Sequence, residues 1–223
     1  MGQKNKLQES AAPSAVVGIV DSPEAWRLAA RLRPGSLDAL ECRADCLPDI
    51  AAIPTSRLPW ILTVRHPREG GRGGHSSEQR KKLFFRLLAG AAVVDVELRS
   101  MRVMRKVFEA AAERKIRRIA SFHDFRATPS SAQLRELAFR AEDSGADVFK
   151  VATWAAAPRD IVRLLELFSS SPLPLAAMAM GPLGFSSRLL FAACGSAFNY
   201  GWLHRPNAPG QWPALELKKM LAR

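Results

Sequence analysis

Short apolar runs rich in Val, Ile, Leu and Phe recur at roughly regular intervals along the chain. A run of this kind, bounded by polar or turn-forming segments, is typical of a buried β-strand. Eight runs fit the description: residues 15–20, 39–43, 60–64, 93–98, 118–122, 147–151, 175–180 and 197–200. The sequence therefore predicts eight buried strands.

Amphipathic segments separate the predicted strands. Apolar residues recur at every third or fourth position, which gathers them on one face of an α-helix, in residues 77–89, 101–114, 131–143 and 159–168. Two helix starts carry capping signals. Ser77 stands before Glu78, and in Ser22-Pro23-Glu24 the proline occupies the first helical position.

Alternating strands and helices are the pattern of repeated βα units. Eight units leave no sequence for a second domain, which favours an α/β fold, the (β/α)8 TIM barrel, formed as a single domain by residues 15–223. An open, flavodoxin-like sheet of six or seven strands is the alternative. We expect residues 1–14 to form a flexible N-terminal tail.

The chain is basic, with 33 Lys and Arg against 21 Asp and Glu and a formal net charge of +12. This balance suits nucleic acid, an acidic membrane surface or an anionic small substrate, and charge alone does not choose between them. The densest basic cluster, residues 114–118, lies where a helix is predicted to end, and cations there complement the helix C-terminus. Because no zinc-finger, helix-turn-helix or RNP-like motif is present, we expect no nucleic-acid partner.

The three cysteines, Cys42, Cys46 and Cys194, form neither an even disulfide framework nor a paired CxxC set. The longest apolar runs are too short to span a bilayer, and the polar start of the chain lacks the apolar stretch of a signal peptide. We therefore expect a reduced, cytoplasmic protein with no membrane partner and no structural zinc site.

Charged side chains interrupt the predicted strands near their C-terminal ends. A barrel strand points alternate side chains inward, so residues two apart at this end share the mouth of the barrel, where barrel active sites lie. Charges in a barrel wall destabilise the fold unless they are paired or used in function. The side chains concerned are Glu41, Arg43, Arg65, Asp95, Glu97, His123 and Lys150.

Each of these residues also has a purely structural explanation. Glu41 and Arg43 could form an ion pair at the rim of the barrel. His123, next to Asp124, could cap a turn. Lys150 could project from an edge strand, but a closed barrel has no edges, so this explanation fails if the predicted fold is correct.

Two loops flank the predicted site. Residues 69–74, Glu-Gly-Gly-Arg-Gly-Gly, lack the Gly-Lys-Ser/Thr ending of a phosphate loop, which favours a mobile lid over a nucleotide cradle. Residues 206–211, after the last predicted strand, are a second lid candidate. An ordinary surface loop is the alternative for both.

Seven short motifs follow one another from the second predicted strand to the last helix. They are Glu41-x-Arg43, Thr63-x-Arg65 followed by Glu69-Gly70-Gly71, Val94-Asp95-Val96-Glu97, Ser121-Phe122-His123-Asp124-Phe125, Phe149-Lys150-Val151-Ala152, Met180-Gly181 leading to Ser187-Arg188-Leu189, and Ala208-Pro209-Gly210-Gln211. In this order they resemble the motif series of the type I 3-dehydroquinate dehydratase family. One such motif would be weak evidence, whereas seven in order are highly specific.

The resemblance implies a homodimeric barrel lyase of the shikimate pathway, which converts 3-dehydroquinate to 3-dehydroshikimate and water and needs no metal or organic cofactor. Lys150 matches the lysine that forms an imine with the substrate ketone, and His123 matches the histidine that moves the protons. Glu97 matches the acid that orients this histidine. A protonated imine is an electron sink, so it makes a weak carbon acid removable by a histidine.

The resemblance also implies a set of substrate-binding residues. Glu41, Arg43 and Arg65 match residues that contact the hydroxyl region of the substrate. Arg188 and Gln211 match the carboxylate side and the lid, and the planar fork of an arginine suits a carboxylate. Glu69, Met180 and Asn207 complete the expected set.

Two positions depart from the family pattern. Asn207 stands where a serine is expected in the lid motif, and Gly18 stands where some members carry a polar residue, so that backbone or water would replace a side-chain contact. Two other functions fit parts of the sequence. One is a different Schiff-base lyase, such as a transaldolase-like enzyme, which typically binds phosphates, and the other is a non-enzymatic basic binding module.

Overall fold

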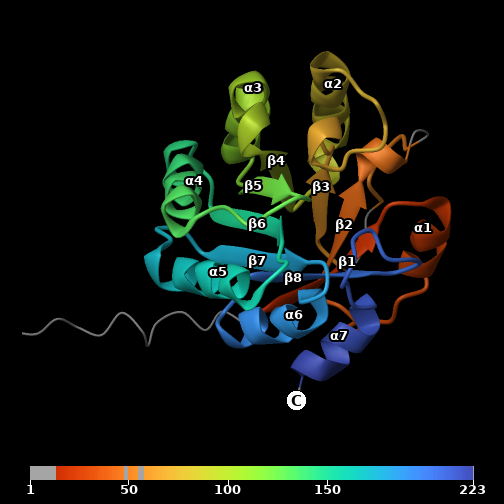
Figure 1. Ribbon diagram of the computed structural model, residues 1–223. Coiled ribbons are helices and arrows are strands. Elements are labelled where there is room, and N and C mark those ends of the chain that lie inside the picture. The colour runs from red at the N-terminus through yellow and green to blue at the C-terminus, as the bar shows by residue number, and fades with distance from the viewer. Residues whose placement is uncertain (1–13, 48–49, 55–57, 223) are drawn as a thin grey trace, which may run out of the picture.

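The computed structural model describes residues 14–47, 50–54 and 58–222, and eight parallel strands form its centre (Figure 1). They are β1 (Ala15–Val20), β2 (Ala39–Arg43), β3 (Trp60–Thr63), β4 (Val93–Glu97), β5 (Arg117–Asp124), β6 (Val148–Trp154), β7 (Leu175–Met180) and β8 (Phe198–Trp202). Their order is β7-β6-β5-β4-β3-β2-β1-β8. Because β8 pairs with β1, and Ala197 N–H donates to the Leu175 carbonyl at 2.8 Å, the sheet curls into a nearly closed barrel.

This order confirms the predicted TIM barrel and contradicts the open flavodoxin-like sheet. Five strands differ in extent from the prediction. β3 and β4 each end one residue earlier, at Thr63 and Glu97. β5 and β6 run on to Asp124 and Trp154, and β8 begins and ends later than predicted. As a result, His123 lies inside β5, paired with Ala152 of β6, and does not follow the strand.

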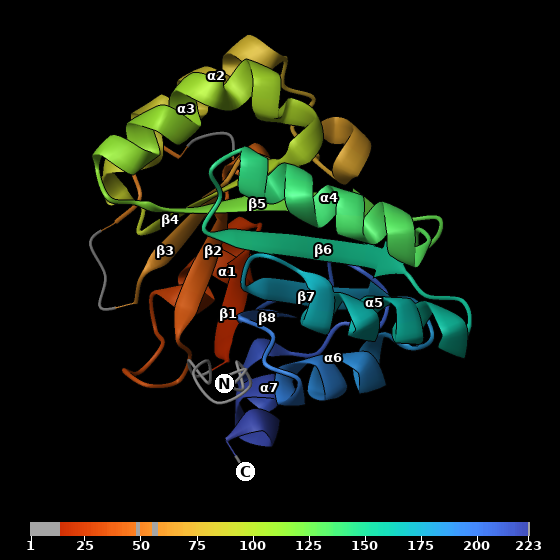
Figure 2. The same cartoon turned by 90° about the vertical axis from the view of Figure 1, so that its left-hand side faces the viewer.

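Helices surround the barrel, with α2 next to α3 and α4 next to α5 (Figure 1 and Figure 2). In the described residues they are α1 (Pro23–Ala29), α2 (Ser77–Leu87), α3 (Met101–Glu113), α4 (Ser131–Asp143), α5 (Pro158–Ser170), α6 (Gly184–Ala193) and α7 (Ala214–Leu221). Short 3-10 turns are η1 (Ala44–Cys46), η2 (Pro67–Glu69), η3 (Leu88–Gly90) and η4 (Leu98–Ser100). Between β2 and β3 the described segments hold η1 and no α-helix, so the eighth helix of an ideal barrel is not seen there.

The two predicted helix starts have different outcomes. Ser22 caps α1 by accepting from Ala25 N–H at 3.1 Å, with Pro23 in the first turn, as predicted. The cap of α2 is Ser76, so the prediction of Ser77 is wrong by one residue. A capping box needs Glu or Gln three residues after the cap, and Gln79 stands at that distance from Ser76.

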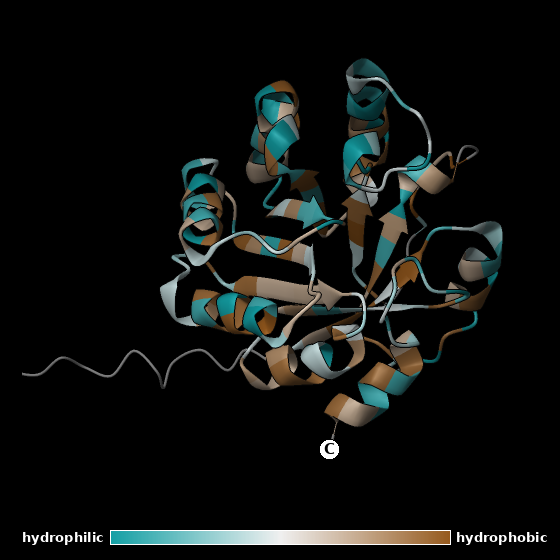
Figure 3. Cartoon of the chain, in the orientation of Figure 1, coloured by the Kyte–Doolittle hydropathy of each residue, from teal (hydrophilic) through white to brown (hydrophobic). Residues whose placement is uncertain are grey.

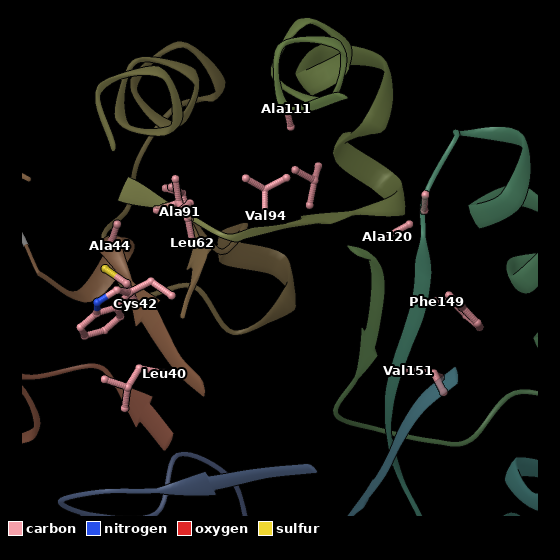
Figure 4. Packing of buried hydrophobic residues seen from close by; sticks show 14 of the residues in the cluster. Leu40, Cys42, Ala44, Leu62, Ala91, Val94, Ala111, Ala120, Phe149 and Val151 are labelled. Carbon is pink, nitrogen blue, oxygen red and sulfur yellow. The ribbon is translucent and has the colours of Figure 1, made fainter. Parts of the chain in front are cut away.

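Hydrophobic residues form two layers. One lies between the strands and the helices and includes Leu40, Leu62, Phe149 and Val151 (Figure 4). In keeping with this, the strands are largely apolar in Figure 3, whereas the helices mix apolar and polar residues. The other layer fills the barrel interior with residues such as Ile61 and Ile119, which lie at alternate strand positions.

The predicted tail, residues 1–14, lies outside the described residues except for Ser14, whose hydroxyl donates to the Ser196 carbonyl at 2.6 Å.

Gly18, the first-strand departure from the family pattern, faces the outer layer, since a Cβ there would lie 2.7 Å from Leu37 Cδ1 and 3.2 Å from Leu40 Cδ2. The missing side chain at Gly18 therefore removes no contact from the barrel mouth.

No helix within the described ranges combines the length and hydropathy that crossing a bilayer requires.

Candidate active site

The carboxyl ends of the strands surround a pocket of about 350 Å³. The polar end of the barrel begins where the inward positions change from Ile61 and Ile119 to charged and hydroxyl side chains. Of the eleven residues predicted for the site, the pocket is lined by ten: Glu41, Arg43, Arg65, Glu69, His123, Lys150, Met180, Arg188, Asn207 and Gln211. Glu97 is fully buried outside the pocket lining.

Lys150 lies on β6 with only 3% of its surface exposed. Its neighbours Phe149 and Val151 point to the helices, so the strand pleat directs Lys150 into the barrel. The Nζ atom donates to Asp95 Oδ2 at 2.8 Å and to Glu41 Oε1 at 3.1 Å. It also lies 3.8 Å from the ring centroid of Tyr200, within cation–π distance.

Asp95 connects the cations of the site. Besides Lys150, it accepts from Arg65 Nη2 at 3.1 Å and from Ser121 Oγ at 2.5 Å. Burial raises the pKa of this carboxyl, but the charges of Arg65 and Lys150 outweigh burial and hold the pKa well below its usual range. Asp95 is therefore a permanent anion that fixes the positions of both cations.

His123 is held by its Nδ1 atom. This nitrogen lies 2.9 Å from Glu69 Oε2 and 3.0 Å from Arg65 Nη1, and the same Glu69 oxygen accepts from the His123 backbone N–H at 3.0 Å. Nε2 makes no hydrogen bond within the described ranges. Burial, reinforced by the charges of Arg65 and Lys150, lowers the pKa of His123 well below its ordinary value, so the ring is neutral at neutral pH and able to accept a proton.

The carboxylate beside the histidine is Glu69, and the expected role of Glu97 is corrected. Glu97 binds Arg80 Nη2 at 2.5 Å, Ser100 Oγ at 3.0 Å and His66 N–H at 2.8 Å. The physical reason is that the buried guanidinium of Arg80, which approaches from α2 on the helix side of the barrel, forms an ion pair with the Glu97 carboxylate. Glu69 reaches His123 because η2 carries it across the end of β5.

Glu69 has an unusual carboxyl. Burial, together with the nearby charge of Glu97, raises its pKa to about 8, although Arg65, Arg99 and the His123 N–H act in the opposite direction. Glu69 and His123 therefore share about one proton near neutral pH, because one has a raised pKa and the other a lowered one. The tautomer of the ring decides the contact of Nδ1: a protonated Nδ1 donates to Glu69 and leaves Nε2 as the basic nitrogen, whereas an unprotonated Nδ1 accepts from Arg65.

We expect Glu69→Gln to change how stability depends on pH. Because the folded-state pKa is raised from 4.5 to about 8, the folded protein holds this proton more tightly, and the free energy of unfolding falls as pH rises through that window. Gln has no such proton. Relative to the parent, the variant should gain about 4 kcal/mol between pH 5 and pH 8.5, roughly 8–16 °C in Tm. Thermal melts at both pH values measure this, and a pH-independent difference would contradict it.

Arg188 has a guanidinium without an anion. It is 3% exposed on α6 and donates to the carbonyls of Tyr200 at 3.1 Å and Gly210 at 3.4 Å. No carboxylate among the residues that the structure describes lies within ion-pair distance of it. Burial lowers its pKa to about 10, which leaves it a cation at neutral pH. A buried, unpaired cation beside a pocket is suited to an anionic ligand group.

The two candidate lids meet at Asp21. This buried carboxylate accepts from Arg72 Nη1 of the glycine-rich loop at 3.0 Å and from Asn207 Nδ2 of the second loop. Asn207 N–H donates to Gln211 Oε1 at 2.9 Å, whereas Asn207 Oδ1 is buried without a partner within the described ranges. Whether the loops move stays a prediction, but their contacts place both over the pocket.

Several site residues had no predicted role. Asp95 was placed at the barrel mouth by the same two-residue spacing as Glu41, but no function in the site was assigned to it. Tyr200, whose buried hydroxyl has no partner among the described residues, follows from the inward alternation of β8. Asp21 and Arg72 lie in loops, where no periodicity indicates direction.

Comparisons with known proteins point to one family. A family model described as type I 3-dehydroquinase matches residues 16–223. A 3-dehydroquinate dehydratase of Thermococcus gammatolerans is 34% identical over 209 residues, covering 92% of this chain and 97% of the relative. One from Pyrococcus abyssi is 35% identical over 196 residues, covering 86% and 89%. The crystal structure of the Geobacillus kaustophilus 3-dehydroquinate dehydratase superposes with a TM-score of 0.81 at 26% identity, covering 95% of this chain and 91% of that one.

Proposed function

The chain belongs to the type I 3-dehydroquinase family, and on this premise we propose that it converts 3-dehydroquinate to 3-dehydroshikimate and water through an imine on Lys150. The observation that carries the mechanism is a buried lysine in the barrel wall, facing a pocket that it shares with a histidine whose side chain is only 9% exposed. A lysine and a proton carrier around one pocket are the two groups that imine-based elimination needs.

The first step attaches the substrate. The Lys150 ammonium passes a proton to the neutral ring of His123, and its amine attacks the ketone carbon while an N–H proton moves to the ketone oxygen, which gives a carbinolamine. The proton on His123 then goes to the carbinolamine hydroxyl, which leaves as water, and a protonated imine remains. Asp95 and Glu41 already accept hydrogen bonds from Nζ, so they orient the amine and stabilise the imine cation that replaces it.

The second step is the elimination. His123 removes a proton from the carbon next to the imine, and the electron pair moves to the imine nitrogen to give an enamine. The pair then returns to form the carbon–carbon double bond as the β-hydroxyl leaves with the proton from His123, as water. Hydrolysis of the imine consumes one water and frees Lys150. In register, His123 pairs with Ala152 and Ser121 pairs with Lys150, so His123 lies one layer above the lysine on the adjacent strand.

The remaining residues bind the substrate in this proposal. Arg188 pairs with the substrate carboxylate, because it is the buried cation without a described counter-ion. Glu41, Arg43 and Arg65 contact the hydroxyl groups from the opposite wall. Met180 lines the pocket, and Gln211 closes it from the second loop.

We expect Asn207→Ser to change kcat/KM by less than about tenfold, or ~1.4 kcal/mol. A hydroxyl replaces one amide hydrogen bond to Asp21, and the backbone contact with Gln211 survives. Gln211→Ala should cost more, since it leaves the Asn207 N–H without its partner. Steady-state kinetics of both variants test this. A hundredfold gain in Asn207→Ser would indicate a different natural substrate.

The substrate assignment is tested by following the absorbance of the conjugated product. Purified protein should form 3-dehydroshikimate from 3-dehydroquinate in phosphate-free buffer. Turnover of a phosphorylated ketose with none of 3-dehydroquinate would instead assign the protein to another class of Schiff-base lyase.

Three further properties belong to the same proposal: a place in the shikimate pathway, a cytoplasmic location and a homodimeric state. The sequence feature behind the cytoplasmic location is the set of three cysteines, Cys42, Cys46 and Cys194, an odd number without a CxxC pair. Light scattering measures the oligomeric state, and a monomer would contradict the dimer.

A further inference from the structure

Arg80 is a buried arginine behind the active site. It belongs to α2, is 1% exposed and does not line the pocket. All three guanidinium nitrogens are used: Nε donates to the Val64 carbonyl at 2.8 Å, Nη1 to Ser100 Oγ at 2.9 Å and Nη2 to Glu97 Oε2 at 2.5 Å. A buried ion pair of this kind is often no more stable than apolar residues of the same volume, so stability alone does not explain it.

The contacts of Arg80 and Glu97 lie on both sides of Arg65. Arg80 binds the carbonyl of Val64, the residue before Arg65, and Glu97 Oε1 accepts from the N–H of His66, the residue after it, at 2.8 Å. Glu97 Oε1 is also 3.8 Å from Arg65 Nη1. One ion pair thus holds the backbone at the two residues that flank Arg65.

This backbone needs an external support. β3 ends at Thr63, and its pairing with β4 also ends there, so sheet hydrogen bonds do not fix residues 64–66. The same segment leads into η2, where Glu69 N–H and Gly71 N–H both donate to the His66 carbonyl. Arg65 and Glu69 are the two side chains that contact His123 Nδ1. The hydrogen bond from His66 N–H to Glu97 therefore fixes the backbone that carries both Arg65 and Glu69.

We propose that Arg80 and Glu97 are positioning residues, which hold Arg65 and Glu69 against His123 without touching the substrate. The inference deepens the proposed function, because it assigns these two residues to the setting of the proton carrier. It requires that loss of the ion pair changes the charge around His123 and leaves Lys150 in place.

The test is the titration of the His123 ring by NMR in the intact protein, with its signal assigned from a His123→Gln sample. In Arg80→Met, the displaced Arg65 no longer lowers the pKa of His123, so the midpoint should rise by about one pH unit. Arg80→Lys retains a positive charge for Glu97 but loses the hydrogen bond from Nε to the Val64 carbonyl. The midpoint of His123 in this variant should lie between those of the parent and Arg80→Met. The matched control is Arg86→Met on the same helix, which loses one hydrogen bond to the Ile50 carbonyl and should titrate like the parent.

Kinetics provide a second readout. Arg80→Met should lower kcat about 10- to 100-fold, KM should rise as well because the displaced Arg65 also lines the pocket, and borohydride trapping on Lys150 should persist. Glu97→Gln should resemble Arg80→Met, and the double variant should be no worse than either single one. If Arg80→Met does not fold, Arg80→Lys alone must show the shifted midpoint.

An unchanged His123 midpoint in a folded Arg80 variant, with only Tm lowered, would reduce Arg80 to a structural residue and overturn the inference. The titration does not depend on turnover. Failure of the parent protein to dehydrate 3-dehydroquinate would therefore reject the proposed function, while the shift in His123 would still decide the positioning role.

Discussion

Replacement of Lys150 by methionine is expected to abolish dehydration of 3-dehydroquinate, with kcat lowered by about four orders of magnitude or more, roughly 5 kcal/mol of transition-state stabilisation. Methionine fills a similar volume but cannot form an imine, so the electron sink is lost and His123 faces a carbon acid too weak to deprotonate. Asp95 keeps Arg65 and Ser121 as partners, which preserves the polar layer of the barrel. The absorbance of the conjugated product measures the effect, and Lys218→Met, which breaks a surface pair with Asp38, is the control.

The same residue is identified chemically by borohydride. Added together with substrate or product, borohydride should inactivate the parent protein and leave one mass adduct on the peptide containing Lys150, since the reagent reduces an imine to a stable amine. The Lys150→Met protein should carry no adduct. An adduct on another lysine, or none in the parent, would reject the imine mechanism.

The strands were predictable because their apolar runs are short and regular. What the pattern missed was strand length where polar residues continue the alternation. Ser121 and His123 point inward while Phe122 lies toward the helices, so period-two geometry continues through a segment whose composition suggests a turn. The α2 cap was missed because two serines compete, and only the side chain three residues later distinguishes them.

Site residues on strands were easier to predict than their partners. Alternation places Lys150 and Asp95 inside the barrel, but it does not say which acid binds which cation. Glu97 has an inward spacing and still pairs with Arg80, which approaches from a helix. Glu69 lies in a loop without periodicity, so its place beside His123 depends on the fold of η2. Sequence motifs could indicate the chemistry, whereas the pairing of charges required three-dimensional distances.

His123→Ala is expected to lower kcat by about a thousandfold while imine formation continues slowly, because the electron sink on Lys150 survives and the proton carrier does not. Borohydride should still trap the adduct on Lys150 in this variant. The matched comparison is His204→Ala, since His204 is exposed and does not line the pocket. It should retain most of the activity.

The pH profile of the parent protein adds a second test of the same role. A base acts only when unprotonated, and the pKa of His123 is lowered by burial and by Arg65 and Lys150, so the acid limb of kcat/KM should fall below pH 6.5. Activity should therefore persist at pH values where an exposed histidine is already protonated. In His123→Ala this limb should disappear, because the imidazole whose protonation causes it is gone. The residual kcat/KM should then be constant across the pH range of the acid limb. A variant with full activity, or one that keeps the same acid limb, would remove His123 from its role and leave the proton carrier to be sought among the other groups of the pocket.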